Sequence, residues 1–418
     1  MIRFIHAADI HIDSPLIGLG RYEGAPVEQI RNATRKALEN LVHLAITEQV
    51  KFVLIAGDLY DGDWRDYNTG LFLSKEMVKL RNEGISVLII TGNHDAESNI
   101  TKSLRMPENV KIFSTKKPET VLIEELNIAV HGQGFLQRAV TENIAASYPE
   151  GLSGYFNIGI LHTSVTGREG HETYAPCQIE TLLSKQYDYW ALGHVHKSEI
   201  LYEDPWIIFP GNIQGRHIRE TGPKGCTLVT IDDGKIISVD QRDLDVLRWC
   251  FCTVSALDAE TPDVILERVR EEVLKEYDQN PGKTLAVRIL ITGSCKAHES
   301  LMKDPDQWIS QIRADATDLS SGLIWIEKVT FRTSPKFDHD KIQGPIRDLI
   351  QYIQGIEAGV IFLKYLKEDY PKLKGKLPRE LYKGENALDL ESPDKAKILL
   401  EDAKHLLTSL LLSGGSSD

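Results

Sequence analysis

The stretch SVLIITGNHD, residues 86–95, runs from an apolar segment into a loop of glycine, amide, imidazole and carboxylate. Its first half predicts a buried strand, because short apolar runs bounded by turn residues are typical of parallel sheets. Two earlier apolar runs, residues 4–8 and 52–56, also stop at loops that carry aspartate or histidine. Segments with helical periodicity separate the three runs, over residues 27–48 and 69–81. This order predicts an α/β sheet whose ligands bind beyond the carboxyl ends of the strands.

The sequence after residue 118 alternates short apolar strands with turns, and two of these strands also end in histidine. Residues 158–161 lead into His162, and residues 187–192 lead into the sequence GHVH, residues 193–196. The same relation between strand end and polar residue therefore continues through a second group of predicted strands.

Three domains are expected, and the first spans residues 1–245. Residues 246–335 follow the order strand, helix, strand, helix, strand and predict a small βαβαβ domain, in which residues 299–319 form one helix. Residues 336–418 show no strand signal and predict a helical C-terminal region. Its helices are expected over residues 342–365 and 393–412. Leucines at helical spacing in this region would either dock on a partner coiled coil or pack on the chain itself.

Composition limits the classes of function that remain open. The chain has 418 residues, and 48 Lys and Arg against 61 Asp and Glu give a formal net charge of −13. This negative net charge disfavours a simple basic nucleic-acid binder, so a polyanionic substrate would need a local basic patch or bound cations. Five cysteines without CxxC spacing fit a reducing compartment. The sequence has no apolar run of roughly 18 residues, and we expect a cytoplasmic protein without a membrane span.

Five short motifs at predicted strand ends carry residue types that bind divalent metal ions. They are Asp9-Ile10-His11, Gly57-Asp58-Leu59-Tyr60-Asp61, Gly92-Asn93-His94-Asp95, His162 and Gly193-His194-Val195-His196. Carboxylate, imidazole and carboxamide suit Mn, Fe or Zn, and none of the cysteines takes part. Two cations that share a bridging carboxylate can activate water and stabilise both oxygens of a phosphoryl displacement. One such motif alone is usually a structural turn, but five in order along one domain predict a metal site.

The ordered pattern D-x-H, G-D-x-x-D, G-N-H-D, H and G-H-x-H resembles the calcineurin-like metallophosphoesterase superfamily over residues 1 to about 245. The continuation FPGN, residues 209–212, and KGCTLV, residues 224–229, is similar to SbcD-type nucleases of DNA double-strand-break repair. The opening FIHAADIHIDSPL, residues 4–16, looks more like the YhaO-type branch. The resemblance implies a four-layer α+β sandwich for the first domain and a capping domain for residues 246–335.

The resemblance also assigns roles to individual residues. It places one metal ion on Asp9, His11, Asp58 and His196, and the other on Asp58, Asn93, His162 and His194, with Asp58 as the bridge. His94 would contact the scissile phosphate or protonate the leaving oxygen, and Asp61 would orient its imidazole. The two divalent ions are expected to be Mn, with Fe, Zn or Mg as alternatives. Arg216 and Arg219 would either bind substrate phosphate or carry solvated surface charge.

The leading functional prediction is a two-metal nuclease that acts on DNA. The resemblance implies an SbcC-like ABC-type ATPase as partner, and a homodimer is a further option. Two alternatives stay open, namely a phosphodiesterase for a cyclic nucleotide or another small phosphodiester, and a metal-free scaffold of the same fold. Every predicted ligand position holds an Asp, His or Asn residue that can bind a metal ion, which disfavours the metal-free scaffold.

Overall fold

The computed structural model describes residues 1–14, 27–61, 67–97, 105–165, 174–336 and 345–356, and single positions between 397 and 411. The chain divides into two compact units. The first comprises Met1–Phe251, Lys275–Arg288 and Ala316–Glu327, and the second comprises Cys252–Leu274, Ile289–Asp315 and Lys328–Asp418. The boundaries expected near residues 245 and 335 stay predictions.

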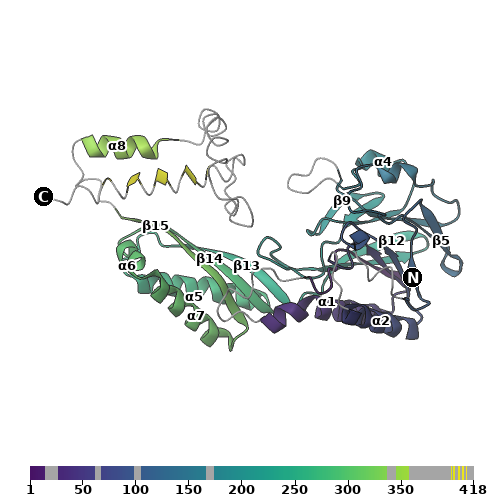
Figure 1. Cartoon of the computed structure of the whole chain (residues 1–418), viewed down its shortest axis with the longest axis horizontal. Helices are drawn as coiled ribbons and strands as arrows, with labels where there is room; N and C mark the ends of the chain where they lie inside the picture. Colours follow the sequence, from purple (N-terminus) through teal and green to yellow (C-terminus); the bar gives the residue numbers. More distant parts are fainter. Residues whose placement is uncertain are drawn as a thin grey trace. The chain divides into compact units, whose positions relative to one another are not determined.

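Two six-stranded sheets form the centre of the first unit (Figure 1). One has the order β12-β11-β1-β2-β3-β4, with β1 at Ile2–Ala7, β2 at Phe52–Ala56, β3 at Ser86–Ile90, β4 at Val110–Ile112, β11 at Gly225–Asp232 and β12 at Lys235–Asp243. The other has the order β5-β6-β7-β8-β10-β9, with β5 at Glu119–Ile123, β6 at Ile128–Gly132, β7 at Phe156–His162, β8 at Tyr189–Gly193, β9 at Glu199–Glu203 and β10 at Trp206–Phe209.

Successive side chains of β1 and β2 point to opposite faces of their sheet, which explains how the layers pack. Phe4 and Phe52 point to the side of the second sheet, where their rings stack with centroids 5.0 Å apart. Ile5 and Val53 point the other way, into a core that also holds residues of α1 (Val27–Thr47) and α2 (Tyr67–Asn82). A strand that is buried on both faces has a continuous apolar sequence, and residues 52–56 show this pattern.

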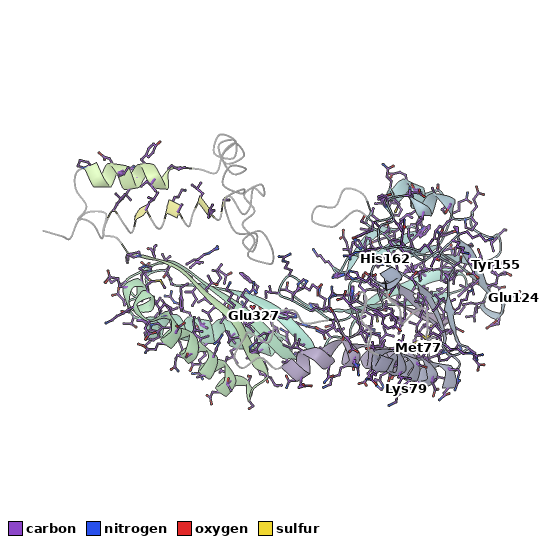
Figure 2. The ribbon with its side chains drawn as sticks, in the orientation of Figure 1. Met77, Lys79, Glu124, Tyr155, His162 and Glu327 are labelled. Atoms are coloured by element: carbon purple, nitrogen blue, oxygen red, sulfur yellow. The ribbon has the colours of Figure 1, made fainter. Side chains whose placement is uncertain are left out.

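The two helices cover the first sheet with one apolar stripe each. On α2, Met77 is buried in the core, whereas Lys79 is half-exposed (Figure 2). Lys79 forms an ion pair with Glu76. A third cluster, on the outer side of the second sheet, includes Trp190 of β8 and Leu182 of the short helix α4 (Ile179–Leu183). Helices therefore cover both outer faces of the paired sheets, and the mixed α/β architecture of the prediction is confirmed.

A three-stranded sheet follows, in the order β13-β14-β15. Its strands are β13 at Leu247–Ser255, β14 at Thr284–Cys295 and β15 at Ile324–Pro335, and its helices are α5 at Pro262–Gln279, α6 at His298–Lys303 and α7 at Pro305–Ser320. The single helix predicted over 299–319 is wrong. Asp304 leaves the helical conformation with φ −147° and ψ 75°, because the residue before a proline is disfavoured there, and Pro305 starts the second helix.

Part of the C-terminal region is described. Helix α8 (Pro345–Gln354) buries Ile350 and Ile353, whereas Leu349 and Tyr352 are exposed. Most of the two helices expected over 342–365 and 393–412 lies outside the described residues. No helix in the part of the chain that the structure describes is long and apolar enough to cross a membrane.

Candidate metal centre

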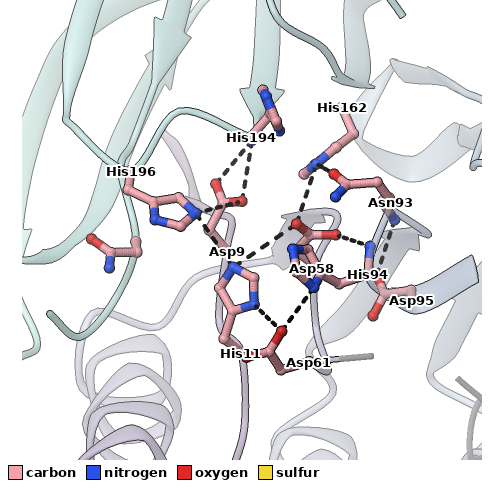
Figure 3. A network of polar contacts seen from close by, with 12 residues as sticks. Asp9, His11, Asp58, Asp61, Asn93, His94, Asp95, His162, His194 and His196 are labelled. Atoms are coloured by element: carbon pink, nitrogen blue, oxygen red, sulfur yellow. Dashed lines mark hydrogen bonds and ion pairs between the residues drawn. The ribbon is translucent and has the colours of Figure 1, made fainter. Parts of the chain in front are cut away.

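The ends of five strands bring the predicted site residues together (Figure 3). Strands β1, β2 and β3 run parallel in one sheet, and β7 and β8 run parallel in the other. Their carboxyl ends carry Asp9 and His11, Asp58 and Asp61, Asn93 and His94, His162, and His194 and His196. Side chains that are up to 187 positions apart in the sequence therefore face one another at one edge of the paired sheets, at 9 and 196.

The backbone is strained at these loops. Four residues of these loops have a positive φ, which residues other than glycine rarely adopt: Asp9 (51°), His11 (46°), Asp58 (52°) and His194 (102°). The close approach of the loops also explains Gly193, because a Cβ atom there would overlap the carbonyl oxygen of Ala56. Strain of this kind persists only where the surrounding structure enforces it, and it clusters at functional sites.

The first group of donor atoms consists of Asp9, His11 and His196. The Nε2 atoms of His11 and His196 lie 3.4 Å apart, and His196 Nε2 lies 3.7 Å from Oδ1 of Asp9. His11 Nε2 also lies 3.9 Å from Oδ2 of Asp58. Imidazole lone pairs and carboxylate oxygens that converge at these distances fit a divalent cation between them.

The second group surrounds His162. Its Nδ1 donates a hydrogen bond to the carbonyl oxygen of Ala56 at 2.9 Å, which leaves Nε2 as the lone-pair atom of the neutral ring. Nε2 lies 2.9 Å from Oδ1 of Asn93 and 3.4 Å from Oδ2 of Asp58. Three acceptor atoms that face one another would repel unless a cation or a proton lies among them, so this donor set also fits a metal ion.

Asp58 stands between the two groups, as expected of a bridging ligand. Its side chain is buried, and its Oδ1 accepts a hydrogen bond from the backbone N–H of His94 at 2.9 Å. Burial alone would raise the pKa of Asp58, but the charge and hydrogen bond of His162 hold that pKa well below its usual range. In return, Asp58 outweighs the effect of burial on His162 and raises the pKa of that imidazole to about 9. This site therefore favours a carboxylate paired with positive charge.

His194 lies beside these groups. Its backbone N–H donates to Asp9 at 2.9 Å, and its ring packs edge-on against His162 and Tyr174, with both centroid distances at 5.3 Å. Among the described residues, three groups of donor atoms could hold a metal ion, and the His194 ring is in none of them. The groups are Asp9, His11 and His196; His11, Asp61 and His94; and Asp9, Asp58 and His162. Its role as a ligand stays a prediction.

His94 and Asp61 form the pair that the resemblance implies. Nδ1 of His94 lies 2.7 Å from Oδ1 of Asp61, and about a third of the His94 side chain is exposed. Burial lowers the pKa of His94, but the hydrogen bond to Asp61 and the charge of Asp58 outweigh it and raise the pKa above its ordinary value. This geometry favours the protonated form of the imidazole beside the predicted metal ligands.

Asp95 has a role that the motif did not reveal. Its carboxylate accepts hydrogen bonds from the backbone N–H groups of Gly92 at 3.0 Å, Leu59 at 3.1 Å and Tyr60 at 2.9 Å. It therefore ties the loop after β3 to the loop that carries Asp58. Burial, with the nearby charge of Asp58, raises the pKa of Asp95 to about 6.

Glu220 was not identified from the sequence. Its buried Oε1 lies 2.6 Å from Nδ1 of His196, and its Oε2 accepts hydrogen bonds from the Asn212 side chain at 3.0 Å and from the backbone of Arg216 at 2.7 Å. Although burial opposes ionisation, the hydrogen bond to His196 and the charge of Arg216 keep the pKa of Glu220 well below its usual range. The carboxylate orients His196 with Nε2 toward Asp9.

The structure places Arg216 and Arg219 differently. One guanidinium nitrogen of Arg216 lies 3.4 Å from Oδ2 of Asp61, and another lies 3.4 Å from Oε1 of Glu220. Arg216 thus joins the carboxylate that holds His94 to the carboxylate that holds His196. Arg219 is exposed and lines the cavity at the site.

The cavity has a volume of about 620 Å³ and is rich in basic groups. Its lining includes the predicted site residues Asp58, Asn93, His94, His194 and His196, the basic residues Arg138, Lys197, His217, Arg219 and Lys224, and the acidic Glu220. The cavity therefore provides a local basic surface in a chain whose formal net charge is −13.

Comparisons with known proteins agree with this geometry. Residues 2–198 match the calcineurin-like phosphoesterase family model, and residues 249–334 match the model of the middle domain of metallophosphoesterase YhaO. A Bacillus subtilis (strain 168) protein, described as uncharacterized metallophosphoesterase YhaO, is 38% identical over 308 residues, which are 73% of this chain and 74% of that protein.

Two solved structures are also similar. A dimetal phosphatase from Danio rerio is 13% identical, covers 56% of this chain and 93% of that chain, and has a TM-score of 0.34. The protein TT1561 of Thermus thermophilus is 14% identical, covers 57% of this chain and 98% of that chain, and has a TM-score of 0.33. The sequence relative from Bacillus subtilis carries the assignment, because it matches about three quarters of both chains. The chain belongs to the calcineurin-like metallophosphoesterase family, whose members are metal-dependent hydrolases of phosphoester bonds with a dinuclear divalent metal centre.

Proposed function

We propose that this chain is a metal-dependent nuclease that hydrolyses phosphodiester bonds in DNA. The observation that carries the proposal is the basic lining of the cavity at the metal centre, where Arg138, Lys197 and Arg219 line the same cavity as predicted ligands. Phosphate contacts from Lys and Arg supply most of the affinity of proteins for nucleic acids. The overall charge of −13 opposes a polyanion at long range, so this local surface is the feature that favours DNA.

The roles of the protein groups follow from their positions. Asp9, His11, Asp58 and His196 would hold one cation, and Asp58, Asn93, His162 and His194 the other. Bound divalent ions would supply an activated water and neutralise the charge on the phosphate, and Mn is the proposed metal. His94, protonated and held by Asp61, donates its proton to the leaving oxygen. Glu220 and Asp95 keep the ligand loops in place.

A partner belongs to the same proposal. We infer that an ABC-type ATPase, similar to SbcC, or a second copy of the chain docks on the C-terminal region. The exposed Leu349 and Tyr352 of α8 support docking, because large apolar side chains on one helix face suit helix-in-groove recognition. Five free cysteines, all buried, fit a cytoplasmic location.

A digestion assay with Mn tests the proposed function. Linear duplex DNA, single strands, hairpins and bis-p-nitrophenyl phosphate are offered to the wild-type chain and to Asp58→Asn. We expect hydrolysis of DNA and of the small diester by the wild type, loss of both on chelation, and loss of both in the variant. Hydrolysis of the small diester without cleavage of any DNA would favour the small-phosphodiester alternative and contradict the nuclease.

A further inference from the structure

Lys224 is a buried cation at the wall of the cavity. Its exposed fraction is 8%, and its Nζ donates a hydrogen bond to the backbone carbonyl oxygen of His196 at 3.1 Å. An ammonium group carries three donors, and no other hydrogen bond of Nζ is found among the described residues. Because Lys224 also lines the cavity, the remaining donors of its Nζ are available to a ligand bound there.

The charges around Lys224 are mixed. Burial lowers the pKa of Lys224, the carboxylates of Glu220 and Asp245 raise it, and the nearby Lys197 lowers it by a smaller amount. The carboxylate of Glu220 is already engaged with His196 and with backbone and side-chain donors, as described above. Lys197 and Lys224 line the same cavity, so an anion bound there would be attracted by both ammonium groups.

The position of these groups suggests which anion it is. Lys197 follows the predicted ligand His196 directly, and Arg219 and Lys224 lie on the segment that also carries Glu220; all of them line the same cavity. Its volume of about 620 Å³ is in the range of sites for whole small molecules, and it extends beyond what one phosphate group needs. Lys and Arg are the side chains that bind phosphate oxygens with charge-assisted hydrogen bonds.

We propose that Lys224, Lys197 and Arg219 form an anion subsite beside the metal centre, which binds a phosphate group adjacent to the scissile one. The ligand class is a chain of nucleotides, or a nucleotide with two phosphate groups. This inference rests on the proposed function, because it takes a polymer of phosphodiesters as the natural substrate. It adds a reason for that choice of substrate, since a small diester with one phosphate leaves the subsite empty.

An inhibition experiment reads the subsite without any cleavage of DNA. The assay follows the expected hydrolysis of bis-p-nitrophenyl phosphate by the Mn-loaded chain and compares adenosine 5′-monophosphate with adenosine 3′,5′-bisphosphate as inhibitor. We expect the bisphosphate to inhibit the wild type about 10-fold more strongly, which corresponds to about 1.4 kcal/mol from the additional charge-assisted contact. The ratio should fall to near one in Lys224→Met and stay high in Lys224→Arg.

Matched variants separate the subsite from other effects. Lys235→Met removes an exposed lysine of β12 that does not line the cavity, and it should keep the wild-type ratio. Lys197→Met and Arg219→Gln should also lower the ratio of inhibition, and neither removes the contact of Lys224 to His196. These two variants test the subsite if Lys224→Met loses metal. Equal inhibition of the wild type by both nucleotides, or an unchanged ratio in all three charge-removing variants, would overturn the subsite. Failure to cleave DNA would count against the nuclease alone.

Discussion

Nδ1 of His196 lies 2.6 Å from Oε1 of Glu220, a carboxylate that is 24 positions away in the sequence and almost fully buried. This contact requires Nδ1 to carry a proton, so the lone pair of the neutral ring is on Nε2, the atom that faces Asp9 and His11. The orientation of one predicted metal ligand therefore depends on a residue outside every metal motif of the sequence.

Replacement of Glu220 by Gln should weaken metal binding. Loss of an outer partner of a ligating histidine typically costs about 10-fold to 100-fold in metal affinity. Calorimetric titration with Mn measures the effect, and Glu203→Gln on the exposed part of β9 is the control. Wild-type affinity at both sites in Glu220→Gln would show that His196 needs no such support.

His94→Ala should lower kcat and leave the metal content unchanged. The imidazole is assigned to the leaving oxygen, and a general acid is worth roughly 10² to 10⁴ in rate. Metal analysis of the purified variant accompanies the kinetics, and loss of metal together with rate would make His94 a ligand.

The pH profile should report the contact between His94 and Asp61. A general acid works below its pKa and stops working as the pH rises through it, and the hydrogen bond to Asp61 raises the pKa of His94. In Asp61→Asn the alkaline limb of kcat should therefore move to lower pH. A limb that stays at the wild-type pH would separate Asp61 from the proton transfer.

Stability should fall in acid because of His6. This buried ring on β1 donates from Nε2 to the carbonyl oxygen of Leu192 on β8 and accepts from the Tyr189 hydroxyl, and burial lowers its pKa to about 3. Unfolding releases the ring to its ordinary pKa of 6.5, so the unfolded chain binds a proton that the folded chain does not between these values. The free energy of unfolding should decrease by about 1.4 kcal/mol per pH unit as the pH falls through this window.

The variant His6→Gln isolates this contribution. Carboxylates also titrate in acid, but they do so in both proteins, so the difference between the two slopes belongs to His6. Urea unfolding at pH 6, 5 and 4 measures both slopes. Parallel slopes in the wild type and the variant would mean that the folded chain protonates His6.

Truncation after residue 336 should preserve metal binding and hydrolysis of bis-p-nitrophenyl phosphate. All predicted ligands lie in the first unit, whose last residues are Ala316–Glu327. A cut at residue 245 is a different experiment, because Trp249, Ala286 and Trp325 pack in one core with Ile30 and Ala33. We expect the longer fragment to fold with wild-type metal content and the shorter one to lose stability; equal melting temperatures would contradict this packing.

Much of the site could be predicted from the sequence, because the predicted ligands lie at or directly after the carboxyl ends of strands. Strands at 52–56 and 86–90 have the expected bounds, since their apolar runs are buried on both faces. Parallel strands then bring Asp58 and Asn93 to the same edge, and no further information is needed to place them together.

The remainder depends on contacts that local patterns do not encode. Glu220 and Lys224 lie on an irregular segment, and their roles follow only from where that segment passes His196. Helix α4 has five residues, too few for a periodic signal. Pro305 is a signal for a helix boundary in the sequence, but the apolar periodicity continues on both sides of it and favours a single helix.

The stoichiometry of metal binding tests the central claim most directly. The chain is freed of metal and titrated with Mn, and hydrolysis of bis-p-nitrophenyl phosphate is followed at each step, for the wild type and for Asp58→Asn. The account predicts two ions per wild-type chain, activity that appears only as the sites fill, and loss of at least one ion and of turnover in the variant. Full activity in the presence of a chelator, or two ions and full turnover in Asp58→Asn, would contradict it.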